Sequence, residues 1–226
     1  VSKHPLATGT VADEFIETVC DENGVISSIN FKNTDRYNFA FDTIDKLAEK
    51  SPNKVAMVWV SNDKTEEHYF TFSDLKKYSA MTANYFTSLG IQKGDRVMLV
   101  LKNHYQFWYS ILALHKMGAI VIPATNQLVE HDFTYRYKSA GVKAIVCTAD
   151  GDVAHQAELA CAEFPGMVKI LVGASREGWH DFNAELPAYS NVYERRPDTP
   201  CGDDTMLMLF TSGTSGYPKI AAHNYK

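Results

Sequence analysis

Short runs of valine, isoleucine and leucine alternate with longer amphipathic segments between residues 95 and 172. The apolar runs are rich in Val, Ile and Leu and do not alternate with polar residues in period two, and glycines stand at the joints. Such strands are typical of a parallel sheet, because helices bury both of its faces. The pattern predicts an α/β fold with a largely parallel sheet and helices on both faces. The apolar runs are RVMLVL, AIVIP, VKAIVCT and MVKILVG, and the segments between them are HYQFWYSILALHKMG, EHDFTYRYKSAG and DVAHQAELACAEFPG.

The segments before this region predict smaller elements. Residues 1–40 are polar and irregular, and we interpret them as an extended N-terminal arm. A short amphipathic helix is expected from residue 41 to the Ser51-Pro52 pair, followed by a hairpin of the runs VAMVWV and EEHYFTF. A longer helix is expected to have Ser73 as its N-cap and to end at Gly90.

These patterns divide the chain into four parts. Residues 1–40 form the arm, and residues 41–172 form an α/β subdomain. Residues 173–204 are rich in proline, aspartate and glycine, which is typical of a joint between subdomains. Residues 205–226 are expected to begin a second, truncated subdomain that carries a glycine-rich loop.

Charge and motif spacing argue against several classes of function. The 226 residues include 22 Lys and Arg against 27 Asp and Glu, with no basic stripe, so we expect no nucleic-acid partner. The histidines show no H-x-x-x-H spacing, so we expect no metal site and interpret them as satisfied core or surface side chains. A hydrolase lacks support, since no G-x-S-x-G motif occurs.

The cysteines and the apolar segments bear on location. The four cysteines are far apart and include no C-x-x-C pair, which favours reduced thiols in a cytoplasmic protein. The first residues lack the apolar run of a signal peptide. The most apolar stretch, residues 105–125, is interrupted by Lys116, Gly118 and Pro123, so we expect a buried helix and strand and no membrane span.

The stretch LFTSGTSGYPK, residues 209–219, has the composition of a phosphate-binding loop. Its glycines allow backbone N–H groups to approach an anion, its hydroxyls add donors, and its lysine supplies positive charge. It is not a Walker A loop, because Tyr217 and Pro218 separate the last glycine from Lys219 and Ile220 replaces the Mg²⁺-binding hydroxyl. The alternative is a polar turn without a ligand.

The order of residues 210–219 resembles the hydrophobic-T-S-G-T-[ST]-G-x-P-K signature of the adenylate-forming enzymes. The segments TFSDLKKYSAMTANYFTSLGIQKGDRVMLVL, ILALHKMGAIVIPAT and DFTYRYKSAGVKAIV also resemble that family. Within it, the chain is most similar to medium-chain and branched-chain acyl-CoA synthetases and to acetyl-CoA synthetases. The resemblance covers roughly residues 36–225 and implies part of the large N-terminal domain of these enzymes.

The resemblance implies a two-step ligase reaction. A small-molecule carboxylate reacts with MgATP to form an acyl-adenylate, and CoA then displaces AMP. The residues implied to bind the β- and γ-phosphates are Thr211, Ser212, Gly213, Thr214, Ser215, Gly216 and Lys219. These residues would stabilise the leaving pyrophosphate electrostatically.

The family's remaining site residues follow the loop at a distance that seven residues cannot hold. They include the adenine pocket, the Mg²⁺-binding glutamate, the ribose-binding aspartate and a catalytic lysine. The chain is therefore interpreted as an N-terminal fragment without a complete catalytic set, inactive alone and dependent on the C-terminal portion of the same enzyme. The alternatives are a non-catalytic nucleotide- or phosphate-binding module and a structural fragment.

Overall fold

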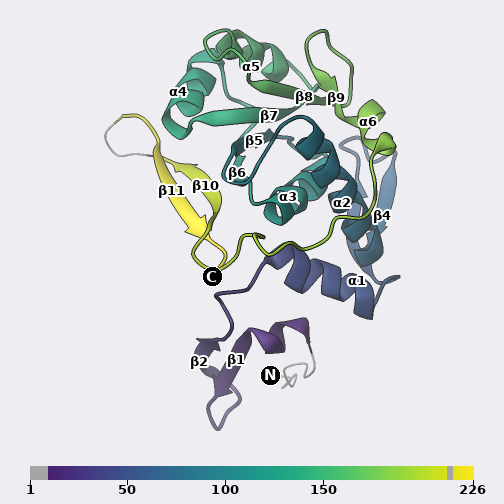
Figure 1. Ribbon diagram of the computed structural model, residues 1–226, viewed down its shortest axis with the longest axis vertical. Coiled ribbons are helices and arrows are strands. Elements are labelled where there is room, and N and C mark those ends of the chain that lie inside the picture. Colours follow the sequence, from purple (N-terminus) through teal and green to yellow (C-terminus); the bar gives the residue numbers. More distant parts are fainter. Residues whose placement is uncertain (1–9, 213–215) are drawn as a thin grey trace.

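The structure is a computed structural model that describes residues 10–212 and 216–226. Its centre is a seven-stranded sheet in the order β11-β10-β6-β5-β7-β8-β9, in which every neighbouring pair is parallel except β10 and β11 (Figure 1). The predicted α/β fold with a largely parallel sheet is confirmed. The strands are β5 (Arg96–Val100), β6 (Ile120–Pro123), β7 (Val142–Thr148), β8 (Val168–Val172), β9 (His180–Asp181), β10 (Thr205–Thr211) and β11 (Lys219–Asn224).

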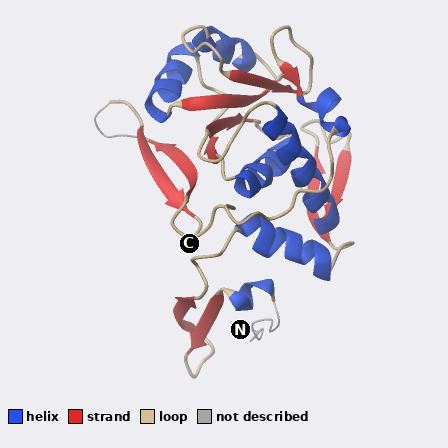
Figure 2. Ribbon diagram, in the orientation of Figure 1, coloured by secondary structure: helices blue, strands red, loops and turns tan. Residues whose placement is uncertain are grey.

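Helices cover both faces of the sheet (Figure 2). α2 (Phe72–Ser88) and α3 (Gln106–Met117) pack on one face, against Val97 and Leu99 of β5. α4 (Glu130–Ala140) and α5 (Val153–Cys161) pack on the other, against Met98 and Val100. Successive side chains of a strand point to opposite faces, so one apolar run supplies both halves of the core. The short helices α6 (Phe182–Glu185) and η3 (Leu186–Ala188) follow β9 on the α2 side.

Local signals set the ends of the helices. The N-cap of α2 is Thr71, not Ser73 as predicted, because Thr71 and Asp74 form a reciprocal capping box. Helices α3 and α4 are followed by Gly118 and Gly141 in the left-handed conformation, with φ of 83° and 60°.

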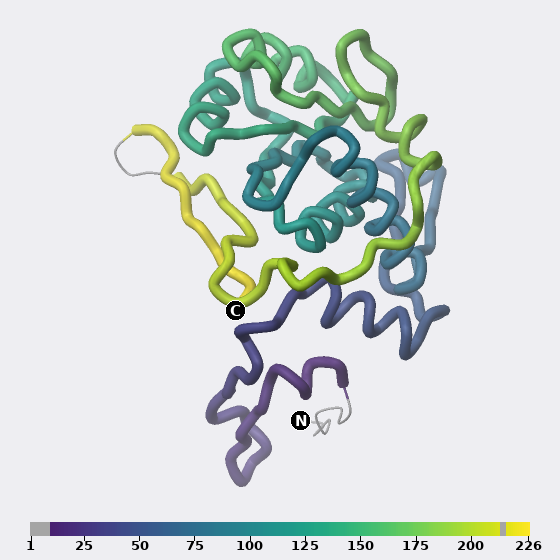
Figure 3. Tube along the Cα trace, viewed as in Figure 1, coloured from purple at the N-terminus to yellow at the C-terminus, as the bar shows by residue number. Residues whose placement is uncertain are grey.

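The N-terminal region is more regular than the sequence indicates. A short 3₁₀ helix, η1 (Val11–Glu14), precedes an antiparallel hairpin of β1 (Ile16–Cys20) and β2 (Ile26–Phe31), which projects from the body (Figure 3). The prediction of irregular structure was wrong for residues 16–31. Both strands are almost entirely exposed, so their apolar residues do not follow the alternation that marks a half-buried strand.

The elements that follow the hairpin agree with their predicted positions. The predicted short helix is π-helical over Ala40–Asp45 (η2) and α-helical over Lys46–Lys50 (α1). The predicted hairpin consists of β3 (Val55–Val60) and β4 (Glu67–Thr71). No helix in residues 10–212 and 216–226 is long and apolar enough to cross a membrane.

Buried polar contacts join this region to the body. Asn38 is completely buried, and its amide donates to the carbonyl oxygens of His115 and Pro200, each at 2.9 Å. Asp42 accepts from Arg195 at 2.7 Å. Three segments that are distant in sequence therefore meet beside α3.

Candidate functional site

The glycine-rich loop connects β10 to β11. Because β10 runs parallel to β6, the loop leaves the sheet at its carboxyl edge, where open α/β sheets bind ligands. In Figure 1 the described ends of the loop lie at the upper end of the yellow β10–β11 pair. The loop therefore directly follows the strand Thr205–Thr211.

The two ends of the loop lie opposite one another. Thr211 and Lys219 are paired residues of the antiparallel β10–β11 ladder, and the Thr211 hydroxyl donates to the Lys219 carbonyl at 3.4 Å. Both residues are exposed, as are Ser212 and Gly216. Lys219 makes no ion pair with any other residue of the described chain. Its ammonium group is therefore available to an anion at the loop.

Among the other predicted loop residues, the structure describes the backbone of Gly216. Gly216 has φ of +114°, and a Cβ added there would meet no atom within 4 Å. A left-handed backbone at this position favours glycine, and the open space would let a ligand approach the backbone. Gly213, Thr214 and Ser215 lie outside the described residues. Of the predicted residues, the structure pairs Thr211 with Lys219, and Ser212 and Gly216 belong to the same loop.

A second polar cluster lies at the same edge of the sheet. His104 follows β5, and its Nε2 lies 2.7 Å from the hydroxyl of Thr148 at the end of β7 and 3.5 Å from a carboxylate oxygen of Asp150. Burial lowers the pKa of His104, and Asp150 opposes that shift. Strand order reverses between β5 and β7, which is the switch point where such sheets bind ligands. Strand order is absent from the sequence, so His104 could not be assigned there.

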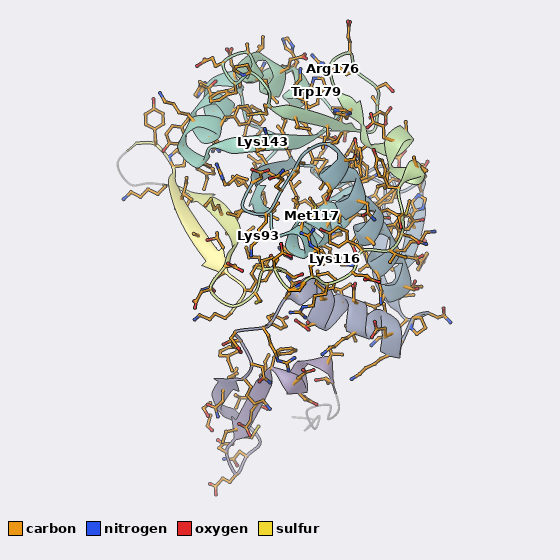
Figure 4. All side chains as sticks on the ribbon, in the orientation of Figure 1. Lys93, Lys116, Met117, Lys143, Arg176 and Trp179 are labelled. Carbon is orange, nitrogen blue, oxygen red and sulfur yellow. The ribbon has the colours of Figure 1, made fainter. Side chains whose placement is uncertain are left out.

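Two adjacent side chains of α3 are buried without being apolar. Figure 4 labels Lys116. Its Nζ lies 2.9 Å from Oδ1 of Asp45 in η2, and 1% of the Lys116 side chain is exposed. Burial lowers the pKa of Lys116 and raises that of Asp45, while their mutual attraction opposes both shifts. The partner of Lys116 was not foreseen, because Asp45 lies 71 residues away in the sequence.

His115 corrects the interpretation of the histidines as satisfied side chains. It is buried, and neither ring nitrogen has a hydrogen-bond partner among the described residues. Its ring packs edge-on against Tyr225 at a centroid distance of 5.8 Å. Residues 10–212 and 216–226 hold no group of three or more His, Cys, Asp or Glu side chains that could bind a metal.

The structure thus defines an α/β protein that carries TSGTSGYPK between β10 and β11, at the carboxyl edge of its sheet. A family model described as "AMP-binding enzyme" matches residues 44–226. The chain therefore belongs to the AMP-binding enzyme family, which confirms the resemblance drawn from the loop.

The chain is similar to acyl-coenzyme A synthetases of mammals. It is 36% identical to the mitochondrial synthetase ACSM5 of Mus musculus, with 83% of this chain and 33% of the relative covered. It is 34% identical to the mitochondrial ACSM2A of Homo sapiens, with 84% and 33% covered. The chain thus spans about a third of the length of these relatives.

Solved structures agree on the fold. The acyl-CoA synthetase of Brucella canis has a TM-score of 0.67 and 26% identity, with 80% of this chain and 33% of that chain covered. The anthranilate CoA ligase AuaEII, solved in complex with anthranoyl-AMP, has a TM-score of 0.70 and 20% identity, with 84% and 35% covered. At 20% identity the second similarity supports the fold alone.

The relatives correct the predicted location. The similar acyl-coenzyme A synthetases of rat, mouse and human are named as mitochondrial proteins. The prediction of a cytoplasmic location was wrong. Reduced thiols do not distinguish the cytoplasm from other reducing compartments, so the cysteine pattern could not carry that conclusion.

Proposed function

We propose that this chain is the N-terminal portion of an AMP-forming acyl-CoA synthetase, an acid–thiol ligase. A short- or medium-chain carboxylate would attack the α-phosphate of MgATP, forming an acyl-adenylate and releasing pyrophosphate. The CoA thiol would then attack the acyl carbonyl and displace AMP. The observation that carries the proposal is the TSGTSGYPK loop at the carboxyl edge of the sheet, in a member of the AMP-binding family.

The loop would hold the phosphates that leave as pyrophosphate. Residues 211–216 would surround the β- and γ-phosphates with backbone N–H groups and hydroxyls, and Lys219 would neutralise their charge. The support is the pairing of Thr211 with Lys219 and the exposure of the lysine. The chain's own contribution is electrostatic stabilisation of the leaving group, without proton transfer.

We also propose that residues 173–204 join two subdomains and that residues 205–226 begin the second one. The support is that every residue of β10 remains at least partly exposed, although β10 pairs with β6 in the same sheet as the first subdomain. We expect no turnover by the chain alone, since it spans about a third of its relatives. The groups that bind adenine, ribose, Mg²⁺ and CoA would come from the remainder of the enzyme.

Carboxylate-dependent exchange of pyrophosphate into ATP tests the proposal in the full-length protein. The substitution Lys219→Ala should slow the exchange by about 10- to 100-fold, because it removes a charge-assisted contact to the leaving group. The matched control is Lys143→Ala, since Lys143 is also exposed but lies at the amino end of β7, at the opposite edge of the sheet.

Exchange by the intact protein with short or medium carboxylates would support the ligase. Absence of exchange with every such acid would overturn it. If pyrophosphate binds at the loop but no exchange occurs, the protein is a phosphate-binding module instead.

A further inference from the structure

Tyr135 of α4 contacts the loop at the point where the chain leaves it. The Tyr135 hydroxyl donates to the carbonyl oxygen of Pro218 at 2.8 Å. The Tyr135 ring stacks on Tyr217 with a centroid distance of 4.6 Å and an interplanar angle of 19°. Two consecutive loop residues are therefore held by a single side chain.

The stack accounts for the position of an exposed aromatic side chain. Tyr217 is 72% exposed, so burial contributes little to its placement. An offset aromatic pair is favourable beyond the area it buries. Tyr135 supplies the ring partner of Tyr217 in the described chain, and its hydroxyl binds the next residue.

The contacts act on the backbone immediately before Lys219. The ring of Pro218 restricts its own φ angle, and the hydrogen bond restrains the orientation of its carbonyl group. The peptide unit between Pro218 and Lys219 is thereby held from the side of α4. The ladder pairing with Thr211 holds Lys219 from the side of β10.

Tyr135 lies on a part of α4 that packs against the core and against β10. Its neighbours Phe133 and Tyr137 are buried in the core, at 0% and 1% exposure. Arg136 lies over the ring of Phe210, 5.2 Å from its centroid, and donates to the Asp132 carbonyl at 3.0 Å. The helix is therefore fixed to β10 and to the core beside the loop.

We infer that Tyr135 is a positioning residue of the phosphate loop. It holds the Tyr217-Pro218 segment so that Lys219 meets the pyrophosphate group without reorganisation during the adenylation step. Positioned charge stabilises a transition state best when the protein does not need to rearrange. This inference rests on the proposed function, and it assigns a role to a residue outside the loop motif.

The two half-reactions of the full-length protein test the inference separately. Adenylation is measured as ATP–pyrophosphate exchange, and thioester formation is measured from a synthetic acyl-adenylate and CoA. Tyr135→Phe keeps the ring stack but removes one hydrogen bond, so exchange should slow about fivefold. Tyr135→Leu removes both contacts and should slow exchange about thirtyfold. Thioester formation should change less than twofold in either variant, a small effect on the scale of one lost hydrogen bond.

Two control variants show whether a loss is specific. Tyr69→Leu changes a tyrosine that is 62% exposed on β4, away from the loop. Lys138→Ala changes an exposed residue of α4. Both should leave the two half-reactions unchanged.

Amide hydrogen exchange provides a readout that needs no catalysis. In the absence of nucleotide, the peptide that contains residues 216–219 should exchange faster in Tyr135→Leu than in the wild type or in Lys138→Ala. Unchanged amide exchange in Tyr135→Leu would overturn the inference.

The kinetic results separate the inference from the proposed function. A wild-type protein without pyrophosphate exchange refutes the proposed ligase and also the role of Tyr135 in adenylation. An active wild type whose Tyr135→Leu variant keeps its exchange rate refutes the inference alone. Equal losses in both half-reactions would mean a general structural role and would also overturn it.

Discussion

Acidification should destabilise this protein through His115. The ring is 5% exposed, and both of its nitrogens lack a hydrogen-bond partner in the described chain. The neighbouring polar groups bind the backbone of His115 and not its ring: the Tyr225 hydroxyl and the Asn38 amide both donate to the His115 carbonyl. Burial lowers the pKa of His115 from 6.5 to about 4.

The sign and size of the effect follow from proton linkage. Between pH 6.5 and pH 4 the unfolded chain binds a proton at His115 that the folded chain does not bind. The free energy of unfolding therefore falls as the pH decreases through this window. A difference of about 2.5 pKa units corresponds to about 3 kcal/mol lost between pH 7 and pH 4.

The substitution His115→Leu tests this reasoning. Leucine has a similar volume, does not titrate and removes two unpartnered nitrogens, so stability at pH 7 should increase by about 1 kcal/mol. Urea unfolding, followed by tryptophan fluorescence at pH 7, 5.5 and 4.5, gives the free energy of unfolding of each form. The difference between wild type and variant should grow by about 2 kcal/mol from pH 7 to pH 4.5.

The matched control is His131→Leu, because His131 is exposed on α4. Its stability should follow that of the wild type at each pH. If wild type and His115→Leu lose stability in parallel on acidification, the reasoning is refuted.

Three further substitutions have expected outcomes in the same urea assay. Thr71→Ala removes the capping box of α2 and should lower the free energy of unfolding by about 1 kcal/mol, whereas Thr71→Ser should restore it. Gly118→Ala places a Cβ 2.9 Å from the Lys93 side chain at φ of +83°, whereas Gly166→Ala places one in open space at a φ of +86°. Gly118→Ala should therefore lower the free energy of unfolding more than Gly166→Ala does. Equal decreases would contradict the steric argument. Asp45→Asn leaves Lys116 charged and unpaired in the interior and should lower the free energy of unfolding by about 3–5 kcal/mol. The further substitution Lys116→Met should restore most of that free energy. A double variant as unstable as the single one would contradict the role of the buried pair.

The layer architecture was predictable because it depends on local patterns. The apolar runs that became β5 to β8 do not alternate with polar residues in period two, and α3 and α4 end at Gly118 and Gly141. These features specify a buried parallel strand and a helix end wherever they occur in a chain. The loop was recognisable for a related reason, since glycines, hydroxyls and a lysine in a constrained order reflect contacts within ten residues.

Features formed by distant segments were not predictable. The hydroxyl of Tyr135 reaches a carbonyl group 83 residues away, and the buried pair of Lys116 and Asp45 joins positions 71 residues apart. Sequence patterns do not show which tyrosine of DFTYRYKSAG contacts the loop or which lysine pairs with a distant carboxylate in the interior. Location was also beyond the sequence pattern, because reduced cysteines fit several compartments.

The sequence by itself determined the α/β class and identified the loop that we propose binds phosphate, because both depend on neighbouring residues and their periodicity. The tertiary structure decided where that chemistry lies. Pairing of β10 with β6 places the loop at the carboxyl edge, and packing of α4 on Phe210 brings Tyr135 to the loop. It also decided that His115 and Lys116 lie away from water. Burial and strand order depend on contacts between segments far apart in the chain, and such contacts exist only once the chain has folded.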